Sequence, residues 1–192
     1  MSRSKLSVDP QTGLLHGVRQ VSSPNADERP AGCLPDLIVV HGISLPAGEF
    51  GGPWIDQLFT NRLDPLAHPS FRELDGLRVS AHLLIRRDGE LIQYVALNRR
   101  AWHAGVSMHH GRDRCNDFSV GIEVEGADDI PYSGEQYAVL ADVVQALRAW
   151  APSLRLAPIV GHSDIAPGRK SDPGLSFDWG RFAQLLEQVR VV

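Results

Sequence analysis

The 192-residue sequence contains few cysteines and no long apolar run. Its two cysteines, Cys33 and Cys115, exclude a disulfide framework, and their spacing does not match a pair of zinc ligands. We expect them to be free thiols in a reducing compartment. No apolar run approaches the length of a membrane span, and the amino-terminal residues lack the apolar stretch of a secretory signal. The sequence therefore predicts a cytoplasmic protein that does not interact with a membrane.

The sequence also lacks a strong charge of either sign. Nineteen Lys and Arg residues against 23 Asp and Glu residues give a formal net charge of −4, and the basic residues are scattered. This pattern excludes the basic patch that is typical of a nucleic-acid-binding protein. Hydrophobic residues make up 43% of the chain, which is enough for a core and argues against disorder. The length favours a single domain over residues 1–192, and we expect a monomer.

Hydrophobic periodicity predicts both strands and helices. Residues 1–36 are polar and interrupted by prolines, so we expect this segment to be largely loop. Apolar or alternating runs predict strands at residues 37–41, 79–86, 91–95, 118–125 and 156–160. An Asp-Gly pair at 88–89 indicates a tight hairpin turn. The sequence therefore predicts an α/β fold with a mixed central sheet.

Three helices are expected beside this sheet. A short one follows Pro53, which suits the first helical position. A longer one begins after Ser133, because Ser133 and Gln136 fit a capping box, and it stops before Pro152. The last helix runs from about residue 178 to 189. Helices are therefore expected on both faces of the sheet.

Two residue types that bind zinc follow the predicted strand at 156–160. His162 and Asp172 lie at the ends of a short connection rich in Pro and Gly. Zinc accepts imidazole nitrogen and carboxylate oxygen, and a catalytic zinc site has three protein ligands. If the end of this connection is extended, Lys170 and Asp172 face one site. His41, at the carboxyl end of the strand at 37–41, is the best candidate for a third ligand, although a lone histidine there is more often structural.

Longer motifs carry a family resemblance. His41, residues 121–126 (Gly-Ile-Glu-Val-Glu-Gly), residues 161–162 and residues 170–174 resemble the zinc-dependent N-acetylmuramoyl-L-alanine amidases. Residues 100–107 and 115–119 are similar to the AmpD type of that family, which recycles anhydromuropeptides in the cytoplasm. The resemblance covers nearly the whole chain. It implies the fold that phage amidases and animal peptidoglycan recognition proteins share.

The resemblance implies a set of site residues. His41, His162 and Asp172 would bind Zn²⁺, which lowers the pKa of its bound water to about 7. Glu123 would shuttle a proton and Lys170 would stabilise the oxyanion. Both Glu123 and Glu125 lie on the same face of the predicted strand, so the alternation of side chains does not show which of them is catalytic. The family pattern selects Glu123.

The same resemblance assigns an anhydromuropeptide as the binding partner. Arg78 and Arg114 match arginines of the family's binding groove, where arginine grips a carboxylate through two hydrogen bonds. Trp102 would form an apolar wall for the sugar. A surface ion pair or a packed tryptophan is an equally good explanation for these residues. The sequence departs from the AmpD pattern at Gly42, where Asn is common, and at Ser70, where Tyr is common.

Some alternatives remain open at this point. His82 and His103 are expected to be core residues or residues that support a ligand, while a second metal site made of His103, His109 and His110 is conceivable. The expected function is cleavage of the lactyl–L-alanine amide of anhydromuropeptides. A recognition module without activity, or an amidase that acts on intact cell wall, would share the same fold.

Overall fold

The computed structural model describes residues 5–189. Six strands form a central sheet in the order β1-β5-β4-β9-β3-β10. Strands β4, β9, β3 and β10 are parallel neighbours, whereas β5 is antiparallel to β4 and parallel to β1. The bounds are Arg19–Gln20 for β1, Leu37–Ile43 for β3, Leu83–Ile85 for β4, Leu91–Gln93 for β5, Ser119–Glu125 for β9 and Ile159–Gly161 for β10. This confirms the predicted α/β class with a mixed sheet.

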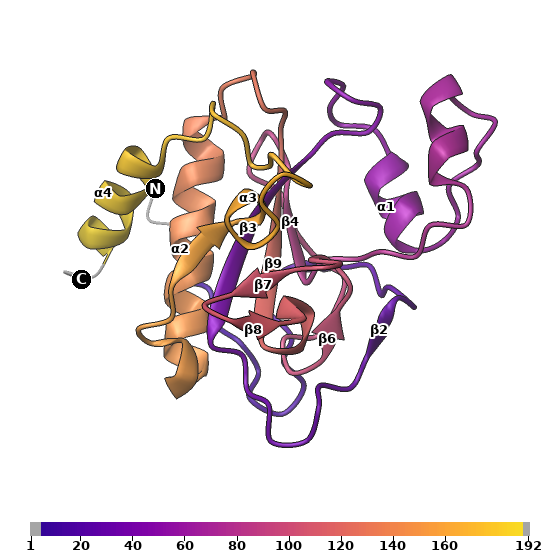
Figure 1. The fold of residues 1–192 in the computed structure, drawn as a ribbon. Helices are drawn as coiled ribbons and strands as arrows, with labels where there is room; N and C mark the ends of the chain where they lie inside the picture. Colours follow the sequence, from indigo (N-terminus) through magenta and orange to yellow (C-terminus); the bar gives the residue numbers. More distant parts are fainter. Residues whose placement is uncertain (1–4, 190–192) are drawn as a thin grey trace.

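Helices flank the sheet on both sides (Figure 1). The long helix α2 and the carboxyl-terminal helix α4 lie together on one side, and α1 lies on the other. The helices are α1 Trp54–Phe59, α2 Gly134–Trp150, α3 His162–Ile165 and α4 Trp179–Val189, with 3₁₀ turns η1 Pro69–Leu74, η2 Cys115–Asp117 and η3 Pro152–Leu154. Two ribbons complete the fold: β2 Ala26–Asp27 with β6 Arg100–Ala101, and β7 Met108–His109 with β8 Arg112–Asp113.

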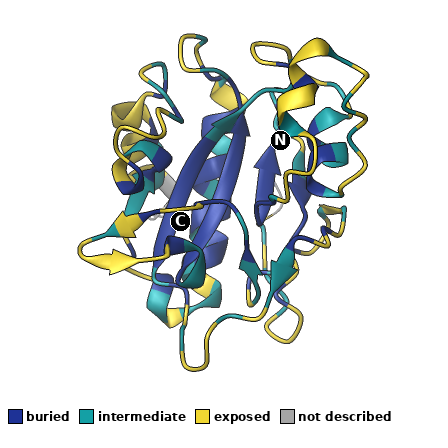
Figure 2. Cartoon of the chain, turned by 45° about the vertical axis from the view of Figure 1, so that its right-hand side comes forward, coloured by how far each residue is buried: buried dark blue, intermediate teal, exposed yellow. Residues whose placement is uncertain are grey.

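Alternation along the central strands gives the sheet two different faces. On β9, Val120, Ile122 and Val124 belong to the core cluster that includes α2. The intervening residues of β9, which include Gly121 and Glu123, point to the opposite face because successive side chains alternate. Figure 2 shows that the central strands are buried, whereas the exposed residues concentrate in outer loops and in the β7–β8 ribbon. The face opposite α2 is therefore buried and also carries polar groups.

The predicted strand at 156–160 is partly wrong. Strand β10 starts only at Ile159, and Leu156 is 84% exposed. The apolar run suggested a buried strand, but β10 lies at the edge of the sheet, where Ile159 and Val160 are only half-buried. Residues 98–117, between two predicted strands, contain short structure, namely β6, β7, β8 and η2. Across residues 5–189, no helix combines the length and apolar character that crossing a bilayer requires.

The capping box of α2 is present as predicted. The Ser133 hydroxyl accepts a hydrogen bond from the Gln136 backbone N–H at 3.2 Å, and the Gln136 side-chain oxygen accepts one from the Ser133 backbone N–H at 3.0 Å. The amide nitrogen of Gln136 also donates to the carbonyl oxygen of Glu125 at 2.8 Å. The first turn of α2 is therefore tied to the carboxyl end of β9.

We expect Ser133→Ala to destabilise the fold by about 1 kcal/mol, because it leaves the Gln136 N–H without its cap. For a chain of this size, this corresponds to a fall in Tm of about 2–4 °C. Urea unfolding monitored by circular dichroism measures the loss, with the exposed Ser22→Ala as the matched control. Equal unfolding free energies for the two variants would show that the cap contributes nothing.

Candidate active site

Two neighbouring strands and one loop bring three candidate ligands together. His41 lies near the carboxyl end of β3 and is 1% exposed. His162 is the first residue of α3, directly after β10, which is parallel to β3. Asp172 lies in the loop after α3, and its carbonyl oxygen accepts a hydrogen bond from the Ser163 backbone N–H at 3.0 Å. Residues separated by up to 131 positions therefore meet at one end of the sheet.

The three side chains form a compact triangle of possible ligand atoms. The Nδ1 atoms of His41 and His162 lie 3.0 Å apart, and Oδ2 of Asp172 lies 3.2 Å from the first and 3.1 Å from the second. In tetrahedral zinc sites with bonds of about 2.0–2.1 Å, the ligand atoms lie about 3.3 Å apart. Among residues 5–189, this is the only group of three such side chains that could hold a metal ion. The donor set and its spacing therefore fit zinc.

The protonation states expected at neutral pH also suit a metal. Burial lowers the pKa of His41 to about 4, despite its contact with Asp172. Burial alone would raise the pKa of Asp172, but its close contacts with the imidazoles of His162 and His41 hold it well below its ordinary range. A histidine binds a metal ion through its neutral imidazole, and an aspartate binds one through its ionised carboxylate. Both residues therefore hold the ligating form at pH 7.

Glu123 lies beside this triangle on β9, in register with His41. It is 8% exposed, and within residues 5–189 its buried Oε2 atom has no hydrogen-bond partner. Burial raises the pKa of Glu123 well above its ordinary value, the charge of Asp172 raises it further, and Lys170 opposes the shift. A carboxyl group whose pKa is raised in this way keeps its proton to a higher pH than a solvated one, which suits general acid–base catalysis.

Glu125, two residues further along the strand, is in a different environment. Its Oε1 accepts hydrogen bonds from Arg86 at 3.0 Å and from the Gly51 backbone N–H at 2.7 Å, and its Oε2 accepts one from the Arg87 N–H at 3.1 Å. This carboxylate therefore anchors the loop that contains Gly51 to the sheet. These hydrogen bonds distinguish Glu125 from Glu123. The alternation of side chains along the strand could not, because it places both glutamates on the same face.

The triangle opens into a cavity of about 190 Å³. Lys170 and Trp102 line it together with the triangle and Glu123. One wall is apolar and consists of Ile43, Leu58, Phe59, Leu77 and Val79. The cavity therefore combines a polar end with an apolar side, as a substrate with both polar and apolar parts requires.

The two arginines proposed to bind substrate lie outside this cavity. Arg78 is exposed and lines an adjacent hollow, which shares Leu58 and Leu77 with the cavity. The side chain of Arg114 is 70% exposed and forms an ion pair with Asp117 at 3.3 Å. A ligand longer than the cavity is needed to reach Arg78. Their role in binding stays a prediction, as does that of Trp102.

The two departures from the AmpD pattern have different surroundings. A side chain at Gly42 would overlap the hydroxyl of Tyr132, which is buried and donates a hydrogen bond to the Pro173 carbonyl oxygen at 2.9 Å. The absence of a side chain at 42 therefore makes room for a contact that holds the loop after Asp172. Ser70 is exposed and hydrogen-bonds with Nδ1 of His68 at 2.8 Å.

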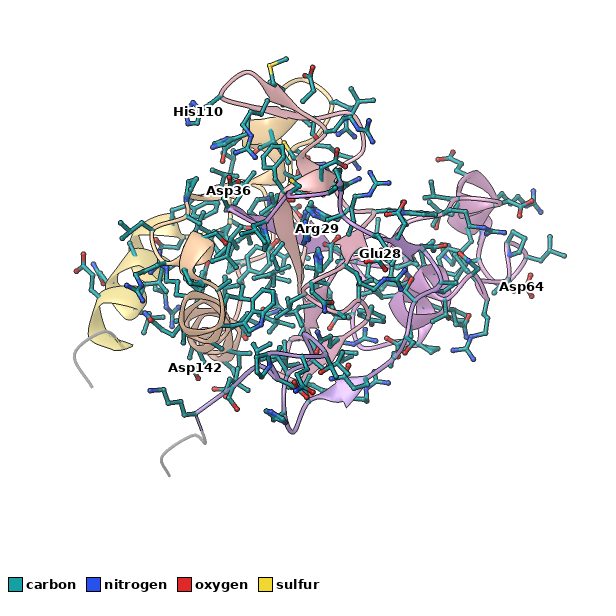
Figure 3. All side chains as sticks on the ribbon, turned by 90° about the horizontal axis from the view of Figure 1, so that it is seen from below. Glu28, Arg29, Asp36, Asp64, His110 and Asp142 are labelled. Carbon is teal, nitrogen blue, oxygen red and sulfur yellow. The ribbon has the colours of Figure 1, made fainter. Side chains whose placement is uncertain are left out.

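The remaining histidines divide as expected. His82 is fully buried, and His103 is 8% exposed and contacts His41. His109 and His110 meet edge to face in the β7–β8 ribbon with ring centres 4.2 Å apart, and Figure 3 shows His110 at the edge of the molecule. Within the described chain, they form no metal-binding group with His103. Sequence reasoning did not single out Asn116 or Ser119, which support His103 across 13 and 16 positions.

Comparisons with known proteins show which family this chain resembles. The family described as N-acetylmuramoyl-L-alanine amidase matches residues 31–175. The chain is 57% identical to 1,6-anhydro-N-acetylmuramyl-L-alanine amidase AmpD of Escherichia coli (strain K12), over 93% of this chain and 97% of that protein. A crystal structure of an AmpD derivative superposes with a TM-score of 0.89 at 56% identity, covering 93% of this chain and 98% of that one.

A more distant structure has a bound ligand. AmpDh3 from Pseudomonas aeruginosa, in complex with an anhydromuramic pentapeptide, has a TM-score of 0.56 at 27% identity and covers 79% of this chain and 59% of that one. The family match covers well over half of the sequence, and the relative from Escherichia coli covers nearly all of it. The chain therefore belongs to the N-acetylmuramoyl-L-alanine amidase family.

Proposed function

We propose that this protein is a zinc hydrolase that cleaves the amide between the lactyl group of 1,6-anhydro-N-acetylmuramic acid and L-alanine. The observation that carries the proposal is the triangle of His41, His162 and Asp172, with ligand atoms 3.0–3.2 Å apart, beside a buried carboxyl group. The names of the curated relatives supply the substrate class. Those names specify the 1,6-anhydro sugar, which favours fragments that carry this sugar as the substrate.

Each residue has a distinct task in this proposal. His41, His162 and Asp172 hold the zinc ion, which when bound acts as a Lewis acid and lowers the pKa of water to about 7. Glu123 takes a proton from the attacking water and gives it to the leaving amine of alanine. Lys170, at the exposed end of the cavity, contributes positive charge where the oxyanion develops.

The cavity also fits the proposed substrate. Its apolar wall is suited to the lactyl and sugar carbons, and the hollow that contains Arg78 extends it in a direction where a stem-peptide carboxylate would find a cation. A recognition module without activity has no need for an unpaired buried carboxyl group beside the triangle. The cytoplasmic location and the monomeric state stay predictions.

We expect the zinc-loaded protein to bind about one zinc ion per chain and to release free stem peptide from an anhydromuropeptide. Asp172→Ala removes the only anionic ligand, so it should lose both zinc and activity. Metal analysis and mass spectrometry of the products measure the two effects. The matched control is Asp64→Ala, since Asp64 lies at the far edge of the molecule (Figure 3).

Three outcomes of that experiment would contradict the proposal. Binding of the fragment without cleavage, unchanged by a chelator, would indicate a recognition module. Faster cleavage of intact or reduced-sugar peptidoglycan than of the anhydro form would indicate a wall-degrading amidase. Full zinc content and activity in Asp172→Ala would exclude the triangle as the site.

Glu123→Gln should lower kcat by about 10²–10⁴-fold, the usual contribution of a general acid–base group. Zinc content and KM should change little, because the amide is nearly isosteric and does not belong to the triangle. Steady-state kinetics with the exposed Glu49→Gln as a control separate the two effects. Retention of more than a tenth of the wild-type kcat would assign the proton transfer to another group.

Glu123 should also make the stability of the metal-free protein depend on pH. The folded state raises the pKa of Glu123 above its ordinary value of 4.5, so above that pH the folded state binds more protons than the unfolded state. Stability contributed by protonated Glu123 is therefore present below pH 4.5 and is lost as the pH rises through the raised pKa. Metal-free Glu123→Gln should gain stability relative to the wild type as the pH rises from 4.5 towards the raised pKa, as measured by urea unfolding. A constant difference across that range would disprove the burial effect.

A further inference from the structure

His103 contacts the candidate ligand His41 on the side away from the triangle. Its Nδ1 lies 2.9 Å from Nε2 of His41, and the two rings meet edge to face with an interplanar angle of 83°. His103 follows β6 in sequence and crosses over β9, where Gly121 has no side chain. A Cβ at 121 would overlap the ring of His103. The sheet therefore leaves space for an imidazole at this point.

The hydrogen bonds beyond His103 set the direction of this contact. Ser119 has one hydroxyl proton, and its Oγ donates that proton to the Cys115 carbonyl oxygen at 2.6 Å. The same Oγ lies 3.0 Å from Nε2 of His103, so it must accept a hydrogen bond there. Nε2 of His103 therefore carries a proton. The His103 ring is buried, and its hydrogen-bond partners in the described residues are His41 and Ser119, neither of which is a carboxylate that could balance a positive charge. The ring is therefore neutral, and its Nδ1 is an unprotonated acceptor.

This direction fixes the tautomer of His41. An acceptor at Nδ1 of His103 requires His41 to donate from Nε2, which leaves the lone pair of His41 Nδ1 facing the triangle. A histidine that binds a metal usually donates its other N–H to a neighbouring acceptor in this way. The chain of contacts from the Cys115 carbonyl through Ser119 and His103 therefore selects the ligating form of His41.

The next residue in the sequence does the same for the second histidine. The Ala104 carbonyl oxygen lies 3.2 Å from Nε2 of His162, whose Nδ1 faces the triangle. One side-chain oxygen, Oδ1 of Asn116, accepts hydrogen bonds from the backbone N–H groups of both His103 and Ala104, at 3.0 and 2.8 Å. The dipeptide His103-Ala104, held by Asn116, therefore contacts the Nε2 atoms of both His41 and His162, which point away from the triangle.

We infer that His103 is a positioning residue for the metal site: it accepts a hydrogen bond from Nε2 of His41 and thereby directs the Nδ1 lone pair of His41 at the ion. The inference rests on the proposed zinc site and concerns a residue outside the triangle. Residues 103–104 thus orient both histidine ligands through hydrogen bonds at their Nε2 atoms. Ser119 and Asn116 fix the orientation of these two residues in turn.

Zinc affinity tests the inference without reference to turnover. His103→Ala should weaken zinc binding by about 10–100-fold, the usual cost of removing a partner of a histidine ligand. Competition with a chromophoric chelator measures the affinity. His103→Asn should recover most of it, because its side-chain oxygen can take the place of Nδ1 and accept from His41. Ser119→Ala should give a smaller loss, since it removes only the contact that orients His103.

The control is His109→Ala, a half-buried histidine of the neighbouring ribbon, which should bind zinc as tightly as the wild type. Thermal unfolding of the metal-free variants separates loss of folding from loss of the contact. Equal affinities for a folded His103→Ala and the wild type would overturn the inference while leaving the proposed zinc site intact. Failure of the wild type to bind zinc would overturn the proposed function instead.

The tautomer itself gives a second measurement that does not depend on zinc. In ¹⁵N-labelled metal-free protein, long-range ¹⁵N–¹H spectra should show the proton of His41 on Nε2 in the wild type and in His103→Asn. In His103→Ala, this preference should be lost. A wild-type His41 protonated on Nδ1 would overturn the inference whatever the zinc affinity.

Discussion

Three lone pairs face one small space at the end of this sheet. The two imidazole nitrogens and the carboxylate oxygen lie within 3.2 Å of one another, so without a shared proton or cation they would repel. Such an arrangement is held only if other contacts fix each side chain. Apolar packing on the α2 face sets the register of β3 and β9, and that register places His41 beside Glu123. The site therefore depends on the core on the far side of the sheet.

The two glutamates of β9 show how the same strand serves both structure and chemistry. The negative charge of Glu125 is stabilised by hydrogen bonds from Arg86 and from two backbone N–H groups. These bonds also fasten the loop that contains Gly51 to the sheet. Glu123 has a buried oxygen without a hydrogen-bond partner in residues 5–189, a cost that folding alone does not justify. Natural proteins accept such costs mainly at functional sites. The contrast in hydrogen bonding therefore supports the assignment of Glu123 to catalysis.

The sequence predicted what depends on local patterns. The β-branched run of β3, the Asp-Gly turn and the Ser133 cap each involve neighbours in the chain, so all three appeared where expected. The edge position of β10 depends on which strands pair, and the apolar run at 156–160 carried no information about it. Likewise, the contacts of Asn116 and Ser119 with His103 arise from tertiary packing, so no spacing rule could reveal them.

The three candidate ligands differ in how they are held, and this difference explains the surrounding contacts. His41 lies on a central strand and His162 starts a helix, so the backbone fixes both. Asp172 lies on a loop and needs extra restraint. The Ser163 N–H donates a hydrogen bond to its carbonyl oxygen, and the Tyr132 hydroxyl donates one to the carbonyl oxygen of Pro173. Tyr132 reaches this position only because Gly42 has no side chain. The glycine after His41 thus helps to preorganise the third ligand, which keeps a metal site rigid.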